Sequence, residues 1–405
     1  MSYTIKLVSF NISHRITIYS KRGGSGTLNS KIKIVVVGLK FGKYIIESQI
    51  CAGPGEPFME LVGVCDLDEE TSKTLANTFS VKKYDSLAAI LSDPQVQAVG
   101  LFTPPAGRAA LVRQIINAGK HVITTKPFEL NCDEGLKVLK EARSLHKAVH
   151  MNSPGPYLDI ETKTFLEWQE KFSLGQPISA RWETFAHYQE QADGSWFDDP
   201  LRCPVAPVFR LGIYGINQMI SLCGQVQSVG VCHSRINTGR PTPDTADLSL
   251  RFENGALGSI FASFSSSDGD SYSNIMHIHF EHGSIRAEVT KPTEDWDEIE
   301  KKLILQAKSP NGEIFHRSKL IKNSEIHGKY QWGNFKKAIE NSTLIEDEMS
   351  PEMIMHAMEV INAMSIAEQN NMRVDVVSSV PSCFEYSHAD TLNLNSQKLD
   401  VDEVN

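Results

Sequence analysis

The chain has 405 residues, more than one hydrophobic core normally holds, so we expect two domains. Hydrophobic residues make up 41% and charged residues 22%, which excludes a fully disordered, collagen-like or multi-span membrane protein. The formal net charge of −9 gives no general attraction to phosphate backbones, so we expect no nucleic-acid partner.

Cysteine usage and the N-terminus indicate the compartment. The seven cysteines are scattered and form no Cys-X-X-Cys pair, whereas zinc ribbons and disulfide frameworks need tighter spacing. The chain start lacks an apolar core followed by a cleavage site, and no stretch approaches the ~20 apolar residues of a membrane helix. These features predict a cytoplasmic protein with reduced thiols and no membrane contact.

The first half of the chain alternates strand and helix patterns. Residues 1–30 predict an N-terminal arm that ends in a Gly/Ser-rich linker. Apolar, β-branched runs then occur at 31–38, 59–66, 97–105, 121–127 and 148–154, with helical spacing between them. Near-continuous apolar strands separated by helices are typical of a parallel sheet that is covered on both faces. We therefore expect a doubly wound, dinucleotide-binding Rossmann domain over 31–150.

The second half of the chain shows mainly strand patterns. Strand-like runs with short turns, including Asn254-Gly255 and His282-Gly283, follow one another from about residue 175. Helical spacing is confined to 208–224 and to two segments near the end. These patterns predict an α+β domain over 151–376 with a large, open, mostly antiparallel sheet, and a polar tail over 377–405. The predicted fold class of the whole chain is α/β.

A glycine-bounded turn follows the first predicted strand. Gly38 comes directly after the strand and Gly42 stands at the head of the next helix, but Lys40 occupies the usual place of another glycine. Such a turn lets main-chain amides approach a pyrophosphate at the helix N-terminus. A purely structural turn has the same appearance, so this motif leaves both alternatives open.

Asp66 ends the second predicted strand, where an acid can accept hydrogen bonds from ribose hydroxyls. A carboxylate there disfavours a ribose 2′-phosphate, so NAD is favoured over NADP. The positive charge of Lys40 could still meet a phosphate. The alternative for Asp66 is a plain helix cap.

An ordered set of motifs resembles one oxidoreductase family, the glucose–fructose oxidoreductase / inositol dehydrogenase / rhizopine-catabolism (Gfo/Idh/MocA) family. The motifs span most of 31–376 and include GLKFG, GVCDLD, AGKHVITTKPFELN, SWFDDP, LGIYGIN and FENGALGSI. The resemblance implies a Rossmann domain followed by a domain with a large open sheet. It also implies that NAD is held by Gly38, Lys40, Phe41, Gly42, Asp66, Thr103, Pro104, Lys126 and Pro127.

Lys126 stands in the family's central Glu-Lys-Pro motif, which is Thr125-Lys126-Pro127 in this chain. The resemblance implies that the Lys126 ammonium orients the substrate hydroxyl and stabilises the alkoxide that develops as hydride leaves. The peptide bond before this proline is commonly cis in the family. The alternative is a surface lysine at a strand end.

The family's second catalytic element is an Asp and a His four residues apart on a helix, and the matching positions are Arg210 and Tyr214. The resemblance implies that Tyr214 exchanges a proton with the substrate, with its ordinary pKa of ~10 lowered by Lys126. The guanidinium of Arg210 would bind an acidic substituent of the substrate, or else pair with a local acid such as Asp198 or Asp199. Asn217 stands where the family often has an acid, which implies a further substrate contact.

These observations predict an NAD(P)-dependent oxidoreductase that transfers hydride between nicotinamide and a secondary alcohol or ketone of a sugar, sugar acid or cyclitol. A dinucleotide-binding regulator without catalytic activity remains an alternative, as does a reductase of a non-sugar such as a linear tetrapyrrole. No metal is expected, because no ligand set completes the cluster of His277, His279 and His282. The resemblance also implies a homodimer or homotetramer formed through the second-domain sheet.

Overall fold

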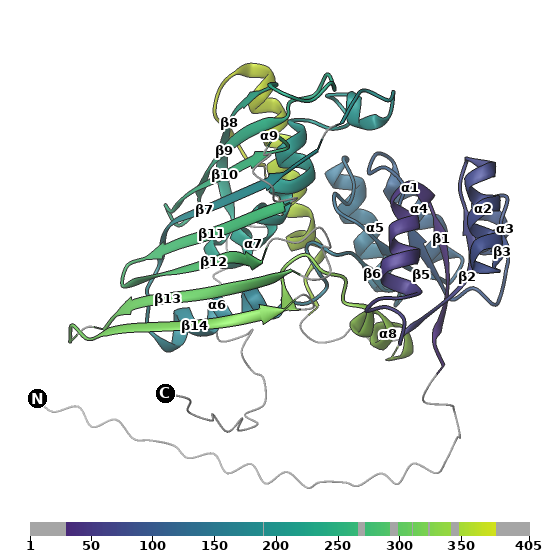
Figure 1. The fold of residues 1–405 in the computed structure, drawn as a ribbon, viewed down its shortest axis with the longest axis horizontal. Helices are drawn as coiled ribbons and strands as arrows, with labels where there is room; N and C mark the ends of the chain where they lie inside the picture. The colour runs from purple at the N-terminus through teal and green to yellow at the C-terminus, as the bar shows by residue number, and fades with distance from the viewer. Residues whose placement is uncertain are drawn as a thin grey trace, which may run out of the picture. The chain divides into compact units, whose positions relative to one another are not determined.

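The structure is a computed structural model that describes residues 30–188, 190–265, 272–291, 299–309, 311–322, 325–341 and 348–377. The predicted N-terminal arm and polar C-terminal tail lie outside the described residues, apart from Ser30 and Val377. Figure 1 shows two sheets with their helices.

The first sheet has six parallel strands in the order β3-β2-β1-β4-β5-β6. Its strands are β1 (Ile32–Val37), β2 (Met59–Cys65), β3 (Lys82–Lys83), β4 (Ala98–Leu101), β5 (His121–Thr124) and β6 (Val149–His150). This order is that of a dinucleotide-binding Rossmann sheet, so the predicted fold of the first half is confirmed. The two-residue strand β3 had no sequence pattern of its own, because two residues cannot show a period.

Helices cover both faces of this sheet (Figure 1). They are α1 (Leu39–Tyr44), which continues as the π-helical turn η1 (Ile45–Ile50), α2 (Glu69–Phe79), α3 (Leu87–Leu91), α4 (Arg108–Asn117) and α5 (Cys132–Ser144). Val35 of β1 belongs to the same core cluster as Val112 of α4 and Val138 of α5. Its neighbours Ile34 and Val36 belong to a second cluster, which includes residues of η1 and α2. Alternate residues of one strand therefore lie in two cores, which explains the continuous apolar run.

The second sheet has nine strands in the order β14-β13-β12-β11-β7-β10-β9-β8-β15. All neighbouring pairs are antiparallel except β7 with β10, so the predicted large and mostly antiparallel sheet is confirmed. Its strands are β7 (Pro177–Ala186), β8 (Val226–Ser234), β9 (Thr245–Phe252), β10 (Leu257–Ser263), β11 (Tyr272–Phe280), β12 (Gly283–Lys291), β13 (Glu300–Lys308), β14 (Ile314–Lys322) and β15 (Val374–Asp375).

The remaining helices accompany the second half of the chain. They are α6 (Ile160–Lys171), η2 (Trp196–Asp198), the π-helical turn η3 (Val208–Gly212), α7 (Ile213–Cys223), α8 (Trp332–Asn341) and α9 (Pro351–Asn370). Helices α6, α7 and α9 lie along one face of the nine-stranded sheet (Figure 1). Helix α8 instead inserts Trp332 and Phe335 into the core cluster beside β1. The last part of the chain therefore packs against both sheets.

Candidate functional site

The glycine turn is shaped by the close approach of two loops. Gly38 caps α1 with φ of +87°, a conformation that favours glycine. A Cβ at Gly38 would also lie only 2.8 Å from the carbonyl carbon and oxygen of Phe102, just after β4. At Gly42 a Cβ would lie 2.8 Å from Val36 Cγ1, so this glycine lets α1 approach β1. Lys40 is exposed on the first turn of the helix.

Asp66 ties this turn to the end of β2. Its Oδ2 accepts a hydrogen bond from the Leu39 main-chain N–H, and its Oδ1 accepts one from Asp68 N at 2.9 Å. The N-cap of α2 is Asp68, whose carboxylate accepts hydrogen bonds from Glu70 N and Thr71 N. Asp66 is thus not the helix cap that the sequence left open. It lies at the carboxyl edge of β2, where a dinucleotide ribose would lie.

The loop after β4 contains an unsatisfied hydroxyl. Thr103 Oγ1 is buried and has no hydrogen-bond partner among the described residues, and Pro104 is exposed beside it. Buried polar atoms are normally paired. A hydroxyl that lacks a partner, at the carboxyl edge of a Rossmann sheet, fits a site that is completed by a bound dinucleotide.

Lys126 follows β5 at the same edge, and its bond to Pro127 is cis. Its Nζ donates a hydrogen bond to the main-chain carbonyl of Arg210 and lies 4.5 Å from the ring centroid of Tyr214. The structure thus brings the predicted amine and phenol together. Burial, assisted by the Arg210 charge and opposed by Cys203, lowers the pKa of Lys126 to about 7. The amine is therefore poised to gain or lose a proton near neutral pH.

Tyr214 lies in the first turn of α7, and its electrostatics differ from the prediction. Burial raises the pKa of Tyr214 well above its ordinary value, and the neighbouring phenol Tyr330 adds to this effect. The expected lowering by the Lys126 ammonium is wrong, because desolvation of the phenolate dominates and Lys126 itself is held near neutrality. Tyr214 is a phenol that keeps its proton.

Asn152, just after β6, connects the two catalytic candidates. Its Oδ1 accepts from Lys126 N at 3.2 Å, and its Nδ2 donates to Tyr214 Oη at 3.0 Å and to the Gly328 carbonyl at 3.1 Å. Because Tyr214 Oη accepts this bond, its own hydrogen is available for another acceptor. Asn152 was not among the predicted site residues, although its place in the last predicted strand of the Rossmann domain was an available signal.

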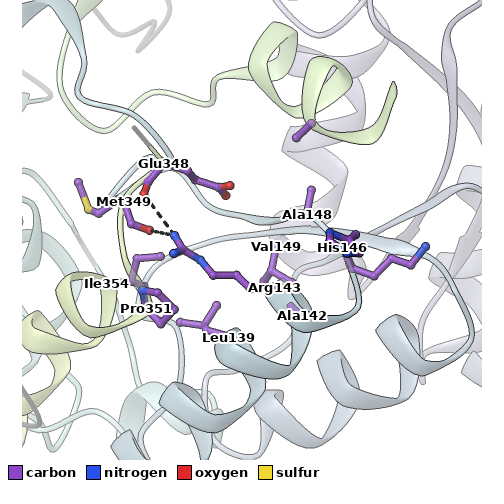
Figure 2. A pocket seen from close by; sticks show the side chains of 12 residues that line it. Leu139, Ala142, Arg143, His146, Ala148, Val149, Glu348, Met349, Pro351 and Ile354 are labelled. Atoms are coloured by element: carbon purple, nitrogen blue, oxygen red, sulfur yellow. Dashed lines mark hydrogen bonds between the residues drawn. The ribbon is translucent and has the colours of Figure 1, made fainter. Parts of the chain in front are cut away.

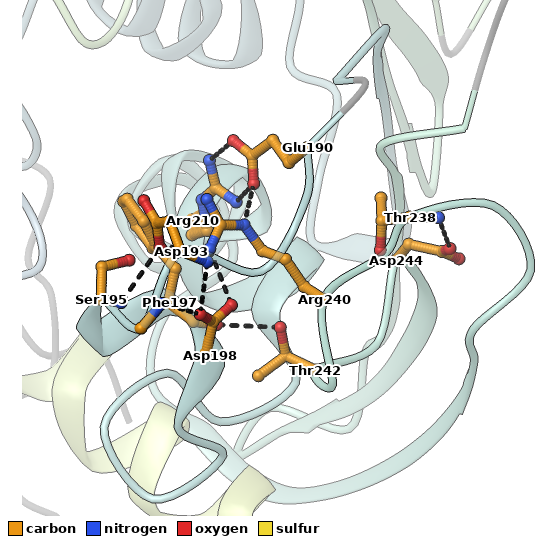
Figure 3. A network of polar contacts seen from close by, with 11 residues as sticks. Glu190, Asp193, Ser195, Phe197, Asp198, Arg210, Thr238, Arg240, Thr242 and Asp244 are labelled. Carbon is orange, nitrogen blue, oxygen red and sulfur yellow. Dashed lines mark hydrogen bonds and ion pairs between the residues drawn. The ribbon is translucent and has the colours of Figure 1, made fainter.

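Arg210 is engaged within the protein. Its two terminal nitrogens each lie 2.7 Å from a carboxylate oxygen of Glu190 (Figure 3). The alternative of pairing with a local acid is confirmed, although the acid is Glu190. The suggested acids were wrong, because Asp198 pairs with Arg240 and Asp199 Oδ1 accepts from Leu201 N. A substrate acid is not favoured as the partner of Arg210, since the guanidinium fork already holds a carboxylate.

Asn217 is also committed to an internal contact. It is 4% exposed, and its Nδ2 donates to Ser153 Oγ at 2.9 Å. This bond joins α7 to the loop after β6, so the side chain acts between segments of the protein. Its proposed substrate contact has no support in this geometry.

Two further residues support the site without having been predicted. Arg108 is fully buried, and its guanidinium donates to the carbonyls of Thr103, Thr125, Pro127 and Phe128. His327, whose Nδ1 lies 2.8 Å from Asp159 Oδ2, places its ring edge-on to Tyr214 with centroids 6.5 Å apart. Arg108 thus joins the loops after β4 and β5, and His327 packs beside the phenol.

A small cavity lies elsewhere, between α5 and the start of α9 (Figure 2). Arg143 crosses it and donates to the carbonyls of Glu348 and Met349 at 3.2 and 2.7 Å. The cavity volume of about 30 Å³ suits a water molecule rather than a substrate. Neither Lys126 nor Tyr214 lines this cavity.

The sheet order, the glycine turn and the strand-end residues define a dinucleotide-binding Rossmann protein with a second α+β domain. The comparison with family models identifies its relatives. Residues 32–153 match the model "Oxidoreductase family, NAD-binding Rossmann fold", and residues 164–286 match the model "GFO/IDH/MocA C-terminal domain". The chain belongs to the Gfo/Idh/MocA family, and its first part matches that family's NAD-binding Rossmann fold.

Individual relatives agree with this assignment. An uncharacterised oxidoreductase of Schizosaccharomyces pombe is 30% identical over 148 residues, which is 36% of this chain and 39% of the relative. The galactose 1-dehydrogenase of Pseudomonas fluorescens is 34% identical over 97 residues, 24% of this chain and 29% of the relative. These alignments thus span less than half of either relative.

Solved structures share the fold at low sequence identity. The WlbA dehydrogenase of Bordetella pertussis, in complex with NADH and UDP-GlcNAcA, superimposes with a TM-score of 0.62 at 17% identity, covering 87% of this chain and 99% of that one. A levoglucosan dehydrogenase in complex with NADH and L-sorbose gives 0.65 at 16% identity, covering 86% and 99%. Both likenesses establish the fold alone.

Proposed function

We propose that this protein is an NAD-dependent dehydrogenase that oxidises a secondary alcohol of an uncharged sugar or cyclitol, or reduces the corresponding ketone. The observation behind this proposal is the meeting of Lys126 and Tyr214, from different halves of the chain, at the carboxyl edge of β5. A sugar acid is not favoured as the substrate, because the Arg210 guanidinium that would bind its carboxylate is already paired with Glu190. Sugar dehydrogenases among the relatives and structural neighbours support a carbohydrate substrate.

The residues at the strand ends fit the dinucleotide. The Gly38 turn would hold the pyrophosphate with Lys40, Phe41 and Gly42 around it, and Asp66 would accept from the adenosine ribose. Thr103, with its unpaired hydroxyl, and Pro104 would lie along the rest of the dinucleotide, next to Lys126 and Pro127. NAD bound there supplies the acceptor or donor of hydride. The Asp66 carboxylate would repel a 2′-phosphate, so we propose NAD rather than NADP.

Lys126 is the proposed proton-exchanging group. With a pKa of about 7, the amine is present in both protonation states at neutral pH. The neutral amine can accept the proton of a substrate hydroxyl as hydride leaves, and the ammonium can return it in the opposite direction. This assignment reverses the roles inferred from the sequence, where Lys126 oriented the substrate and Tyr214 exchanged the proton.

Tyr214 is the proposed hydrogen-bond donor. Because burial raises its pKa, the phenol stays protonated at neutral pH. Asn152 donates to Tyr214 Oη, which leaves the phenolic hydrogen free to point at the substrate oxygen. The phenol would orient that oxygen and stabilise negative charge that develops on it.

The proposal is tested with purified full-length chain. NAD binding is measured by calorimetry, and turnover is then followed by NADH absorbance on a panel of neutral sugars, cyclitols and sugar acids. We expect NAD to bind and at least one neutral polyol to be oxidised. Tight NAD binding without turnover of any alcohol would instead favour the regulator, and preference for a sugar acid would contradict the proposed substrate class.

A further inference from the structure

A cluster of charged side chains is built around Glu190, beside the proposed site (Figure 3). Glu190 Oε1 and Oε2 each lie 2.7 Å from a terminal nitrogen of Arg210, and Oε2 also accepts from Arg240 Nε at 2.7 Å. Arg240 Nη1 then reaches Asp193 at 2.9 Å and Asp198 at 2.7 Å. One carboxylate thus links two arginines, and the second arginine is anchored by two more acids.

Aromatic rings hold the Arg210 guanidinium from its other sides. Its Cζ lies 4.2 Å from the ring centroid of Phe197, 4.7 Å from that of Phe264 and 5.2 Å from that of Tyr188. The side chain of Arg210 is only 13% exposed. A guanidinium that is paired in its plane and flanked by rings has little freedom to move.

The main chain of Arg210 reaches the reactive amine. Arg210 lies in the π-helical turn η3, directly before α7, and its carbonyl accepts a hydrogen bond from Lys126 Nζ. Turns of this kind occur often at functional sites. The residue that anchors the charged cluster therefore also supplies the hydrogen-bond acceptor for Lys126.

We propose that Arg210, fixed by Glu190 and Arg240, is a positioning residue that holds the Lys126 amine in place and keeps it ready to lose its proton. The inference rests on the proposed function only in that Lys126 exchanges the proton. Arg210 acts on Lys126 in two ways. Its carbonyl orients Nζ, and its positive charge disfavours the ammonium form. Arg210 therefore acts through Lys126 and does not bind the substrate.

The groups that act on the Lys126 amine agree with this assignment. Among the described residues, its charge interactions are with Arg210 from η3 and with the buried Cys203 thiol before η3, and the Tyr214 ring from α7 lies beside it. Among these, Arg210 is the group whose charge lowers the pKa of Lys126, in addition to burial. Burial alone would raise the pKa of Glu190, but Arg210 and Arg240 lower it overall, so the carboxylate stays ionised between them.

The test is a direct titration of Lys126 that needs no substrate. Lysines are labelled by reductive ¹³C-methylation, the Lys126 signal is assigned by its absence in Lys126→Arg, and its chemical shift is followed against pH. We expect a midpoint near 7 in the wild type. Arg210→Met should raise this midpoint by about one pH unit or more, since a nearby positive charge is lost.

Two matched variants separate the effect of the Arg210 charge on Lys126 from a general loosening of the packing around Lys126. Glu190→Gln keeps the Arg210 charge and removes its compensating carboxylate, so the midpoint should stay near 7 or fall. Arg113→Met, on α4, breaks a double ion pair with Glu134 and Glu141 of α5 and should leave the Lys126 midpoint unchanged.

An equal rise of the Lys126 midpoint in Arg210→Met and Glu190→Gln would show that both substitutions merely admit water to the amine, and would overturn the proposal. An unchanged midpoint in Arg210→Met would do the same. If Arg210→Met does not fold, a raised midpoint in Glu190→Gln alone refutes the idea and an unraised one supports it. None of these outcomes depends on turnover, so they are distinguishable from failure of the proposed function.

Discussion

At the scale of single residues, the proposed chemistry divides between an amine that titrates and a phenol that does not. Lys126 has a lowered pKa and Tyr214 a raised one, although they are in contact. The common cause is burial, which disfavours the charged form of each group. The neutral forms are an amine that accepts a proton and a phenol that donates a hydrogen bond, which suits the oxidation of an alcohol.

Tyr214→Phe removes the hydroxyl and leaves the ring beneath Lys126. We expect kcat for alcohol oxidation to fall roughly ten- to a hundredfold, the worth of one hydrogen bond to a developing charge. The fall of activity toward low pH should keep its midpoint near 7, because Lys126 and not Tyr214 titrates there. Steady-state kinetics across pH check this. Loss of that midpoint in the variant would show that the phenol is the titrating group.

Asp66→Asn tests cofactor choice at the end of β2. The amide loses the negative charge that favours ribose hydroxyls and repels a 2′-phosphate, so we expect NAD to bind about tenfold more weakly and the preference over NADP to shrink. Calorimetric titration with both dinucleotides measures this, and a thermal melt checks that the Leu39 contact still supports the fold. An unchanged ratio of the two affinities would remove Asp66 from the proposed ribose site.

At the scale of elements, the loops after β4 and β5 are held together by one buried arginine. Arg108 donates to the carbonyls of Thr103 and Thr125, and Glu129 accepts hydrogen bonds from Gly107 N and Ala109 N at the start of α4. Burial lowers the pKa of Arg108 to about 10, so it remains charged at neutral pH. These loops contribute Lys126 and Thr103 to the proposed site.

Arg108→Met should therefore destabilise the protein by about 3 kcal/mol or more, because buried carbonyls lose their donor and Glu129 loses its nearby cation. Arg113→Met on the same helix is the control. Its 30% exposed side chain pairs at the surface, so its loss should cost about 1 kcal/mol or less. Urea unfolding followed by circular dichroism compares the two. Similar midpoints for both variants would contradict the structural role of Arg108.

Elements that depend on local pattern could be predicted, and contacts between distant loops could not. The run over 31–38 is apolar on both faces, and β1 does lie between two cores. Lys126 was identified because Thr125-Lys126-Pro127 resembles the family's Glu-Lys-Pro motif, and it follows a strand of the same kind. By contrast, the segment before η3 contains several acids, and nothing in their spacing shows that Glu190 rather than Asp198 meets Arg210. Helix α8 was predicted, but its amphipathic pattern does not reveal which sheet it covers.

At the scale of the whole molecule, one face of the nine-stranded sheet has apolar residues open to solvent. Leu257 of β10, Ile275 of β11 and Leu320 of β14 are 59%, 40% and 52% exposed. The ladder places Ile275 and Leu320 in one row across β12 and β13, so they lie on the same face. Among the described residues, no helix is both long and apolar enough to cross a membrane.

We propose this face as the interface of the homodimer or homotetramer that the family resemblance implies. Light scattering should then give a mass two or four times the 45.0 kDa of the chain. Ile275→Arg should shift the protein toward the monomer, because a charge would be buried without a partner at the interface. Ile366→Arg on α9, at a similarly exposed position, is the control. A monomeric wild type, or an Ile275→Arg protein of unchanged mass, would refute this interface.

The most direct test of the account is the pH dependence of kcat/KM for oxidation of an uncharged polyol. The substrate does not titrate, so the profile reports groups of the free enzyme. We expect kcat/KM to fall below a midpoint near pH 7, where the Lys126 amine becomes protonated. Lys126→Met should lose this dependence together with roughly 10²- to 10⁴-fold of the rate, while exposed Lys137→Met behaves as the wild type. A flat wild-type profile through pH 7, or a Lys126→Met enzyme of near-normal rate, would contradict it.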